Sequence, residues 1–251
     1  MDQAPPEWTE SFRVRAYEVD VSGKASVATV CNWLQETAGN HVTALGWAVD
    51  DLAPRGLTWV LSRLHLRLHR LPGWRDDVRI VTWHAGVLRL YGVREFRITD
   101  SSEGELGIAT TGWVLLDLVA RRPIRPPNAL EEMARSTPER VLADPFAKLP
   151  EVSDAKGART FEVRFSDLDM NRHANNVSVI GWALDALPDE VVLGSSLAGL
   201  EIEFRTEAVR GDRIAVEVQR TSGKSATFLH RLVRERDGRE VARARTVWRS
   251  G

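Results

Sequence analysis

The chain has 251 residues, 43% apolar and 27% charged, which is enough to fold around a buried core without crosslinks. Its 34 basic and 35 acidic residues give a formal charge of −1, which argues against a nucleic-acid-binding protein. The single cysteine, Cys31, excludes an intrachain disulfide and a multi-cysteine zinc module. The opening MDQAPPEWTE has no apolar signal core and no apolar run reaches membrane-spanning length, so we expect a cytoplasmic protein that does not enter a membrane.

The first predicted helix follows an N-terminal strand that contains Phe12. In SVATVCNWLQETAGNHVTALG (26–46), apolar residues recur at helical spacing, and Gly46 is the expected stop signal. Downstream, the alternation of Leu64, Leu66 and Leu68 predicts antiparallel sheet strands.

The same order of elements returns later in the chain. A shift of 149 residues places FRVRAYEVDVSGKASVATVCNWL, from Phe12, over FEVRFSDLDMNRHANNVSVIGWA, from Phe161. Further matches follow, with Asp76 over Asp212 at a shift of 136. The second predicted helix, NVSVIGWALDALP, must end by Pro188. The chain is therefore predicted to be a duplicated module, each copy made of a strand, a helix and several antiparallel strands.

This repeat divides the chain into an N-terminal module (1–118), a linker (119–159) and a C-terminal module (160–251). The linker holds six of the eleven prolines, and Asn128 is the expected cap of one short helix in it. A long helix on a curved antiparallel sheet is the hotdog arrangement, so the expected fold class is α+β, a double hotdog. The two sheets are expected to meet edge to edge. A monomer and a homodimer of the double module both satisfy the pattern.

A polar cluster lies between the strand and the helix of the second copy. Alternation along FEVRFSDLDMNRH places Asp167, Asp169, Asn171 and His173 on the parity of the apolar Phe161. Buried polar groups cost about 1–3 kcal/mol each when unpaired, which favours a network or chemistry for the set. Turn and cap chemistry is the alternative for any single residue, with Asn175 or Asn176 as the N-cap of the second helix.

The first copy lacks part of this cluster, because Ser22 and Lys24 stand where the second copy has Asn171 and His173. Chemistry is therefore expected in the second copy, with the first serving binding and packing. Arg172 and Ser178 stand where a calcium-binding loop needs glycine and glutamate, and the other histidines show no zinc-ligand spacing. We predict no metal and no cofactor.

Four segments of the sequence resemble the fatty acyl-acyl carrier protein thioesterases, the plant plastid enzymes and their bacterial relatives. These segments are DLDMNRHANNVSVIGWALD (167–185), YEVDVSGKASVATVCNWLQETAGNHVTALG (17–46), GWRDDVRIVTW (73–83) and LEIEFRTEAVRGD (200–212). The resemblance implies a double hotdog fold. It also implies hydrolysis, in fatty acid biosynthesis, of the thioester joining a fatty acyl chain to the phosphopantetheine arm of acyl carrier protein (ACP).

The resemblance also implies the site residues. The family's active-site positions match Asp169, Asn171, His173 and Glu207. A family position once regarded as a nucleophilic cysteine is Ala208 here, which excludes a thiol nucleophile there, and Cys31 is expected to be a packed core thiol. We therefore expect attack by water with Glu207 as general base, its pKa raised by burial.

Other roles stay open at the level of sequence. His173 is an alternative base or the proton donor to the leaving thiolate, and Asp169 either holds its tautomer or orders the Asn171 loop. Backbone N–H groups near Asn175 and Asn176 are expected to stabilise the oxyanion. Strict alternation turns Glu207 away from the apolar face of its strand, so a strand end or a bulge is needed to bring it to the site.

Because ACP is acidic, a basic docking surface is expected despite the neutral total charge. The candidates lie on the first sheet and in the linker: Arg63, Arg67, Arg70, Arg121, Arg122 and Arg125. Two other functions compete with this one, an acyl-coenzyme A thioesterase and a non-catalytic acyl-binding hotdog protein. A hotdog dehydratase is a third alternative, which the thioesterase motifs disfavour.

Overall fold

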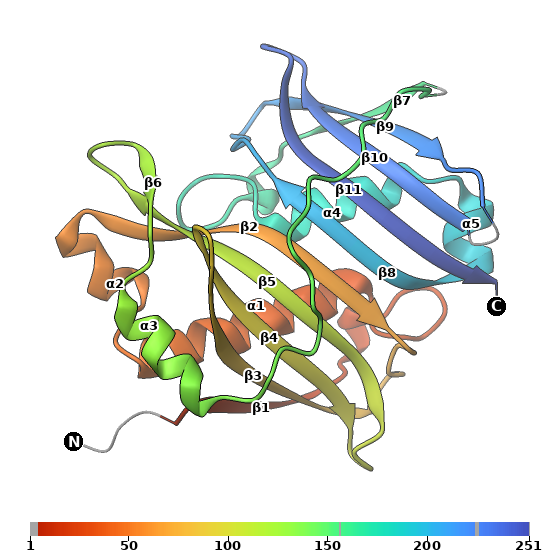
Figure 1. The fold of residues 1–251 in the computed structure, drawn as a ribbon. Helices are drawn as coiled ribbons and strands as arrows, with labels where there is room; N and C mark the ends of the chain where they lie inside the picture. The colour runs from red at the N-terminus through yellow and green to blue at the C-terminus, as the bar shows by residue number, and fades with distance from the viewer. Residues whose placement is uncertain (1–4, 156, 224–225, 251) are drawn as a thin grey trace. The chain divides into compact units, whose positions relative to one another are not determined.

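The computed structural model describes residues 5–155, 157–223 and 226–250. The described residues form two compact units, divided between Phe146 and Ala147 (Figure 1). Each unit combines an antiparallel sheet with helices, so the predicted α+β class is confirmed.

The sheet of the first unit has the strand order β1-β3-β4-β5-β2, with antiparallel neighbours throughout. Its strands are β1 (Glu7–Arg13), β2 (Leu57–Leu68), β3 (Asp77–Leu88), β4 (Tyr91–Asp100) and β5 (Glu105–Asp117), and the short β6 (Arg122–Ile124) pairs with β5. Alternate residues of these strands form the core, with Leu66, Ile80 and Ile98 at most 2% exposed. The predicted alternation is thus confirmed in this unit.

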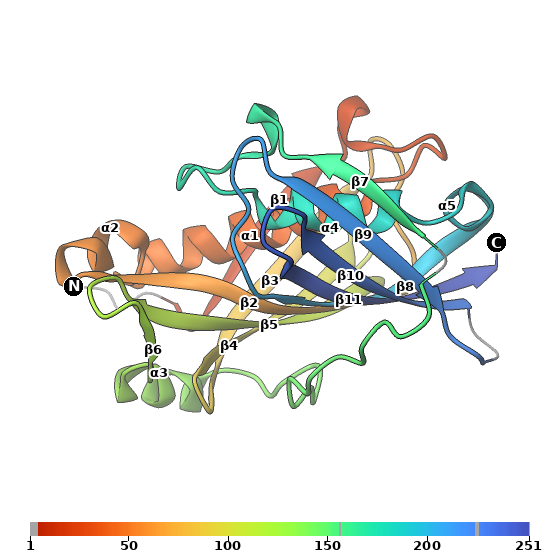
Figure 2. The same cartoon turned by 90° about the horizontal axis from the view of Figure 1, so that it is seen from above.

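The long helix α1 (Val27–Ala44) lies on one face of this sheet, and α3 (Asn128–Met133) lies on the other (Figure 2). Ser26 caps α1, because its Oγ accepts a hydrogen bond from Thr29 N–H at 3.1 Å. The chain leaves α1 through Gly46, whose φ of 72° is in the left-handed region that glycine tolerates. The predicted helix and its stop signal are confirmed. Short turns of helix, α2 (Val49–Leu52) and η2 (Ala53–Arg55), lead into β2.

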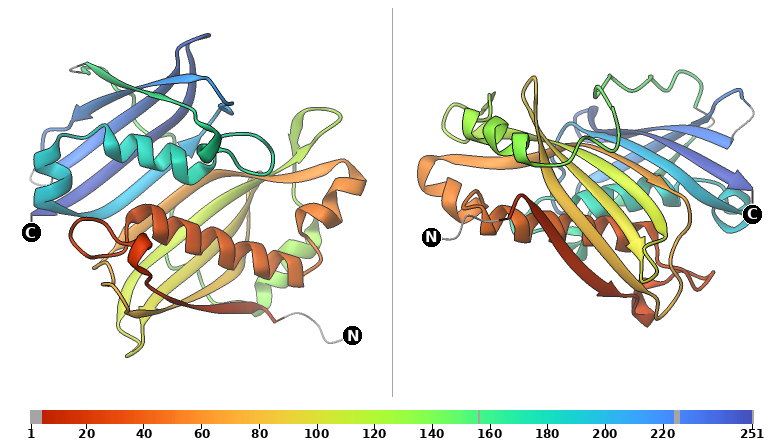
Figure 3. Two further views of the ribbon diagram at one scale, coloured as in Figure 1. Left: turned by 180° about the vertical axis from the view of Figure 1, so that it is seen from behind. Right: turned by 60° about the horizontal axis from the view of Figure 1, so that its bottom comes forward.

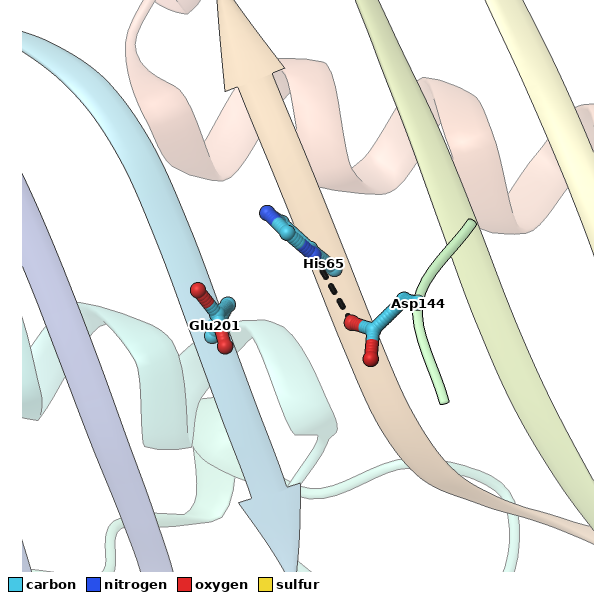
Figure 4. Close-up of side chains that lie close together, drawn as sticks. All are labelled: His65, Asp144 and Glu201. Atoms are coloured by element: carbon cyan, nitrogen blue, oxygen red, sulfur yellow. Dashed lines mark hydrogen bonds and ion pairs between the residues drawn. The ribbon is translucent and has the colours of Figure 1, made fainter. Parts of the chain in front are cut away.

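The first part of the predicted linker packs as part of the first unit. Its predicted helix is α3, but Asn128 is the first helical residue and Pro127, with extended backbone, is the N-cap, so the cap assignment was wrong. After η3 (Ala134–Ser136), the side chain of Arg140 forms an ion pair with the fully buried Glu95 at 2.8 Å. Asp144 Oδ2 lies 2.7 Å from His65 Nδ1 on β2 (Figure 4). These contacts hold the segment against the sheet.

The second unit repeats the arrangement with the strand order β8-β11-β10-β9-β7. Its strands are β7 (Ala158–Glu162), β8 (Ser195–Phe204), β9 (Arg213–Arg220), β10 (Ala226–Arg234) and β11 (Arg239–Ser250). Helix α4 (Asn176–Asp185) lies along one face of this sheet (Figure 3) and buries Ile180 and Trp182. It ends before Pro188, as predicted. The next helix, α5 (Asp189–Gly194), was not predicted. No helix among the residues described here has the length and apolarity needed to cross a membrane.

Three histidines are buried in the two units. Burial lowers the pKa of His41 to about 4, of His84 to about 3 and of His230 to about 4. The charge of the buried Arg94 lowers the pKa of both His41 and His84 further, and Arg94 Nη1 donates a hydrogen bond to His41 Nδ1 at 2.9 Å. All three imidazoles are therefore neutral in the folded protein at pH 7.

This burial predicts a fold that is sensitive to acid. Below pH 6.5 the unfolded chain binds protons at these histidines, whereas the folded chain does not until pH 4 or below. The free energy of unfolding should therefore fall as the pH drops below 6.5, by up to about 1.4 kcal/mol per pH unit for each histidine. Urea titrations at pH 7.5, 6.5 and 5.5 measure this slope. His84→Gln should reduce this slope; an equal slope in the wild type and in His84→Gln would contradict the prediction.

Candidate active site

The polar cluster of the second unit lies in a loop and not on a strand. Strand β7 ends at Glu162, and the chain then forms the turn η4 (Phe165–Asp167). Asp167 holds this turn, because its Oδ2 accepts a hydrogen bond from Arg164 N–H at 2.7 Å. The expectation that alternation continues to His173 was therefore wrong, and Phe165, expected on the core side, is 75% exposed.

Asp169 orders the loop that carries Asn171 and His173. Its Oδ1 accepts hydrogen bonds from Asn171 N–H at 2.8 Å and from His173 N–H at 3.2 Å. Its own N–H donates to His173 O at 2.8 Å, which closes the loop. Of the two roles that the sequence left open for Asp169, these contacts favour the ordering of the loop.

The side chains of His173 and Glu207 face each other, with His173 Nε2 3.3 Å from Glu207 Oε2. The expected strand end is confirmed, since β8 ends at Phe204 and Glu207 lies in the following loop. Backbone contacts join the two loops, because His173 forms a β-bridge with Val209. The expected burial of Glu207 was wrong, since its side chain is 67% exposed. An exposed loop position leaves the carboxylate open to water.

The N-terminus of α4 adjoins these loops. Of the two N-caps that the sequence allowed, Asn175 and Asn176, the structure has Asn175. The Oδ1 of Asn175 accepts a hydrogen bond from Val177 N–H at 2.9 Å. Within the described ranges no acceptor is found for Asn176 N–H. Asn175 therefore serves the helix itself, and Asn176 N–H is left without an intrahelical acceptor in the first turn of α4.

Arg234 and Asp212 support the Glu207 loop, and sequence reasoning missed both. Arg234 Nη1 donates a hydrogen bond to Glu207 O, and Asp212 Oδ2 accepts one from Val209 N–H at 2.9 Å. Arg234 Nη1 and Asp212 Oδ2 lie 3.8 Å apart, and both side chains are buried. The match between Asp76 and Asp212 in the two copies was the sequence signal that could have identified this support.

The first unit repeats the loop scaffold without the imidazole. Asp20 Oδ1 accepts hydrogen bonds from Ser22 N–H at 2.8 Å and from Ser22 Oγ at 2.6 Å. Asp20 N–H donates to Lys24 O at 2.8 Å, the same closure that Asp169 makes with His173. The first copy thus has the turn but a lysine in place of the histidine.

No thiol is positioned for chemistry at this loop. Ala208, which follows Glu207, is 2% exposed and has no functional group. Cys31 is 2% exposed on α1, and burial raises its pKa to about 12. The prediction that Cys31 is a packed core thiol is confirmed.

We expect the native protein to resist alkylation at Cys31, because only an accessible thiolate reacts readily. Treatment with iodoacetamide, followed by mass measurement, should leave the folded protein unmodified and modify one site after unfolding in urea. Cys31→Ala should retain the activity of the wild type. Rapid alkylation of the native protein, or inactivation on Cys31→Ala with an intact fold, would show that this thiol takes part.

Of the six predicted docking arginines, one is buried and five are exposed. Arg63 is only 9% exposed, so its assignment to a docking surface was wrong. The other five side chains are exposed: Arg67, Arg70, Arg121, Arg122 and Arg125. Arg70 forms an ion pair with Asp100, and Arg125 forms one with Glu131. The docking role of the exposed five stays a prediction.

Comparison with known proteins gives matches along nearly all of the chain. Residues 5–133 match the family model "Acyl-ACP thioesterase N-terminal domain", and residues 151–250 match "Acyl-ACP thioesterase C-terminal domain". The oleoyl-acyl carrier protein thioesterase 2 of Arabidopsis thaliana is 31% identical across 96% of this chain and 76% of its own length. The palmitoyl-acyl carrier protein thioesterase of Cuphea hookeriana is 34% identical across 96% of this chain and 61% of its own length.

Solved structures show the same fold. The 12:0-ACP thioesterase from Umbellularia californica has 26% identity and a TM-score of 0.87, and the match covers 98% of this chain and 94% of that chain. An acyl-ACP thioesterase from Bacteroides thetaiotaomicron has 24% identity and a TM-score of 0.88. That match covers 99% of this chain and 100% of the other chain.

Proposed function

The chain belongs to the acyl-ACP thioesterase family, and from this premise we propose that it hydrolyses the thioester between a fatty acyl chain and acyl carrier protein. The products are a free fatty acid and ACP, which places the reaction in fatty acid biosynthesis. The observation that carries the proposal is the contact of His173 Nε2 with Glu207 Oε2, 3.3 Å apart beside the N-terminus of α4. With this activity we also assign the double hotdog fold to the chain.

Water is the proposed nucleophile. Glu207 takes a proton from water as the oxygen attacks the carbonyl carbon of the thioester, and His173 holds the carboxylate in place. Asn171 positions the water or the carbonyl group. The exposure of Glu207 and the absence of a thiol at Ala208 support this scheme over a covalent acyl-enzyme.

Negative charge then develops on the carbonyl oxygen. The Asn176 N–H and the positive end of the α4 dipole stabilise this charge. When the tetrahedral intermediate collapses, the carbon–sulfur bond breaks and the phosphopantetheine thiolate leaves. The proton taken by Glu207 passes through His173 to the sulfur, which yields the acid and the free thiol. The second unit performs this chemistry, and the first unit binds the acyl chain.

A thiol-release assay on ACP loaded with acyl chains of graded length tests the function directly. We expect release of ACP thiol with an equal amount of free fatty acid, and slower release from the same acyl chains on coenzyme A. Faster turnover of the coenzyme A thioesters would favour the acyl-coenzyme A alternative. Binding of acyl-ACP without any release would favour a non-catalytic binding protein.

A further inference from the structure

Most arginines of the second unit have carboxylate partners. Ion pairs of at most 4.0 Å join acidic residues to Arg205, Arg213, Arg231, Arg234, Arg236, Arg239, Arg243 and Arg245. The positive charge of each of these eight arginines is thus offset by a neighbouring carboxylate.

Three exposed arginines beside the candidate site differ from this pattern. Among the residues that the structure describes, no carboxylate pairs with the guanidinium groups of Arg164, Arg172 or Arg210. The nearby carboxylates of Asp167 and Asp169 accept hydrogen bonds from backbone N–H groups of their own loop. These three guanidinium groups are therefore exposed and form no direct ion pair within the described residues.

The three arginines lie on adjoining backbone segments. Gly211 N–H donates to Val163 O at 2.9 Å, which places the residues that carry Arg210 and Arg164 side by side. Arg172 belongs to the loop closed by Asp169, and the following residue forms the β-bridge with Val209. The basic surface thus borders the loops that hold His173 and Glu207.

Two apolar side chains are exposed on the same loop. Phe165 is 75% exposed and lies under Arg210, whose Cζ is 5.9 Å from the ring centroid. Met170 is fully exposed. Apolar side chains set among unpaired cations are typical of a surface that binds a partner with both acidic and apolar groups.

The first unit provides a comparison within the same chain. The repeat places Arg15 opposite Arg164, but Gly23 opposite Arg172 and Trp74 opposite Arg210. Arg15 Nη1 donates to Tyr17 Oη at 3.0 Å. Of the three arginine positions only that of Arg15 is kept in the first unit, where Lys24 and Arg75 are the other exposed cations near the equivalent loop.

We propose that Arg164, Arg172 and Arg210, with Phe165 and Met170, form the surface on which the acidic carrier protein docks. This inference rests on the proposed function, because the site must receive a thioester at the end of a carrier arm. Docking beside the His173 and Glu207 loops brings the thioester end of that arm within reach of the reacting groups. The exposed positive charges raise the rate of encounter with an acidic partner, and the apolar side chains stabilise the docked complex.

Charge reversal tests this surface. The variants are Arg164→Glu, Arg172→Glu and Arg210→Glu, singly and combined, with Arg15→Glu as the matched control in the first unit. Each is assayed on acyl-ACP and on the N-acetylcysteamine thioester of the same acyl chain. The combined variant should lose at least about tenfold in kcat/KM on acyl-ACP at low salt, mainly through KM. This loss should exceed any change on the small thioester, shrink as salt is added, and be absent in Arg15→Glu.

Equal losses on both substrates, no loss on acyl-ACP, or an equal loss in Arg15→Glu would overturn the docking proposal. Fluorescence anisotropy with labelled holo-ACP separates its failure from failure of the proposed function. If the wild-type protein hydrolyses no acyl-ACP but binds ACP and loses that binding on charge reversal, the function fails and the docking surface stands. If it binds no ACP, the docking surface fails as well.

Discussion

Glu207→Gln is expected to lower kcat on acyl-ACP by about 10²–10⁴-fold, the range that general-base catalysis contributes. The amide keeps the size of the side chain but cannot take a proton from water. Because Glu207 is 67% exposed and faces His173, the change should leave the fold intact. Steady-state rates of thiol release measure the effect, and urea titration checks the stability of the variant.

The control for this prediction is Glu190→Gln, which removes an exposed carboxylate of the second unit on α5. Its rate should equal that of the wild type. His173→Gln should also slow turnover, because the imidazole that holds the carboxylate is lost. Near-normal turnover by Glu207→Gln would remove Glu207 from the role of base, and loss only in His173→Gln would assign that role to the imidazole.

Asp169→Ala is expected to lower kcat by about two orders of magnitude, although its carboxylate forms no hydrogen bond with the His173 ring in the structure. The variant removes the acceptor for Asn171 N–H and His173 N–H, so the loop no longer holds these residues in place. Misplacement of a catalytic group by about 1 Å can reduce the rate 10²-fold. Thiol release on acyl-ACP measures the loss.

Asp20→Ala is the matched control, because Asp20 closes the same turn in the first unit. Both variants should lower the free energy of unfolding to a similar, small extent of about 0.5–1.5 kcal/mol, since water can replace the lost acceptor at these exposed loops. Only Asp169→Ala should lose activity to the stated extent. A similar loss of activity in the two variants would show that the effect is one of stability and not of positioning.

The main helices and the repeat could be predicted because their signals are local. α1 and α4 have apolar residues at helical spacing, and Gly46 and Pro188 mark their limits. The duplication reinforced each assignment, since the same order of elements appears twice in one sequence. Strand alternation likewise depends only on which face of the sheet is buried.

The errors arose where local geometry departs from a simple period. Alternation could not reveal that β7 stops at Glu162 and that the chain then turns, which exposes Phe165. The burial of Arg63 depends on packing between segments distant in the sequence, which the alternation along one strand does not specify. The exposure of Glu207 depends on how a loop leaves its strand, which the residue types alone do not specify.

The candidate site was predictable as a set of residues but not as an arrangement. Asp169, Asn171 and His173 were identified as a polar cluster and Glu207 through the family resemblance, yet the contact of His173 with Glu207 joins loops far apart in the sequence. The support of the Glu207 loop by Arg234 was missed, because Arg234 lies at the end of β10, with no motif around it.

The equivalent turns at Asp20 and Asp169, one in each unit, also have a consequence for the evolution of such an enzyme. In a protein assembled from identical single-module subunits, one codon specifies both copies of a loop, so each mutation alters both at once. In this chain separate codons encode Lys24 and His173 in otherwise similar turns. Selection can therefore alter the loop of the first unit, and with it the surface around Lys24, while the loop that holds His173 stays constant.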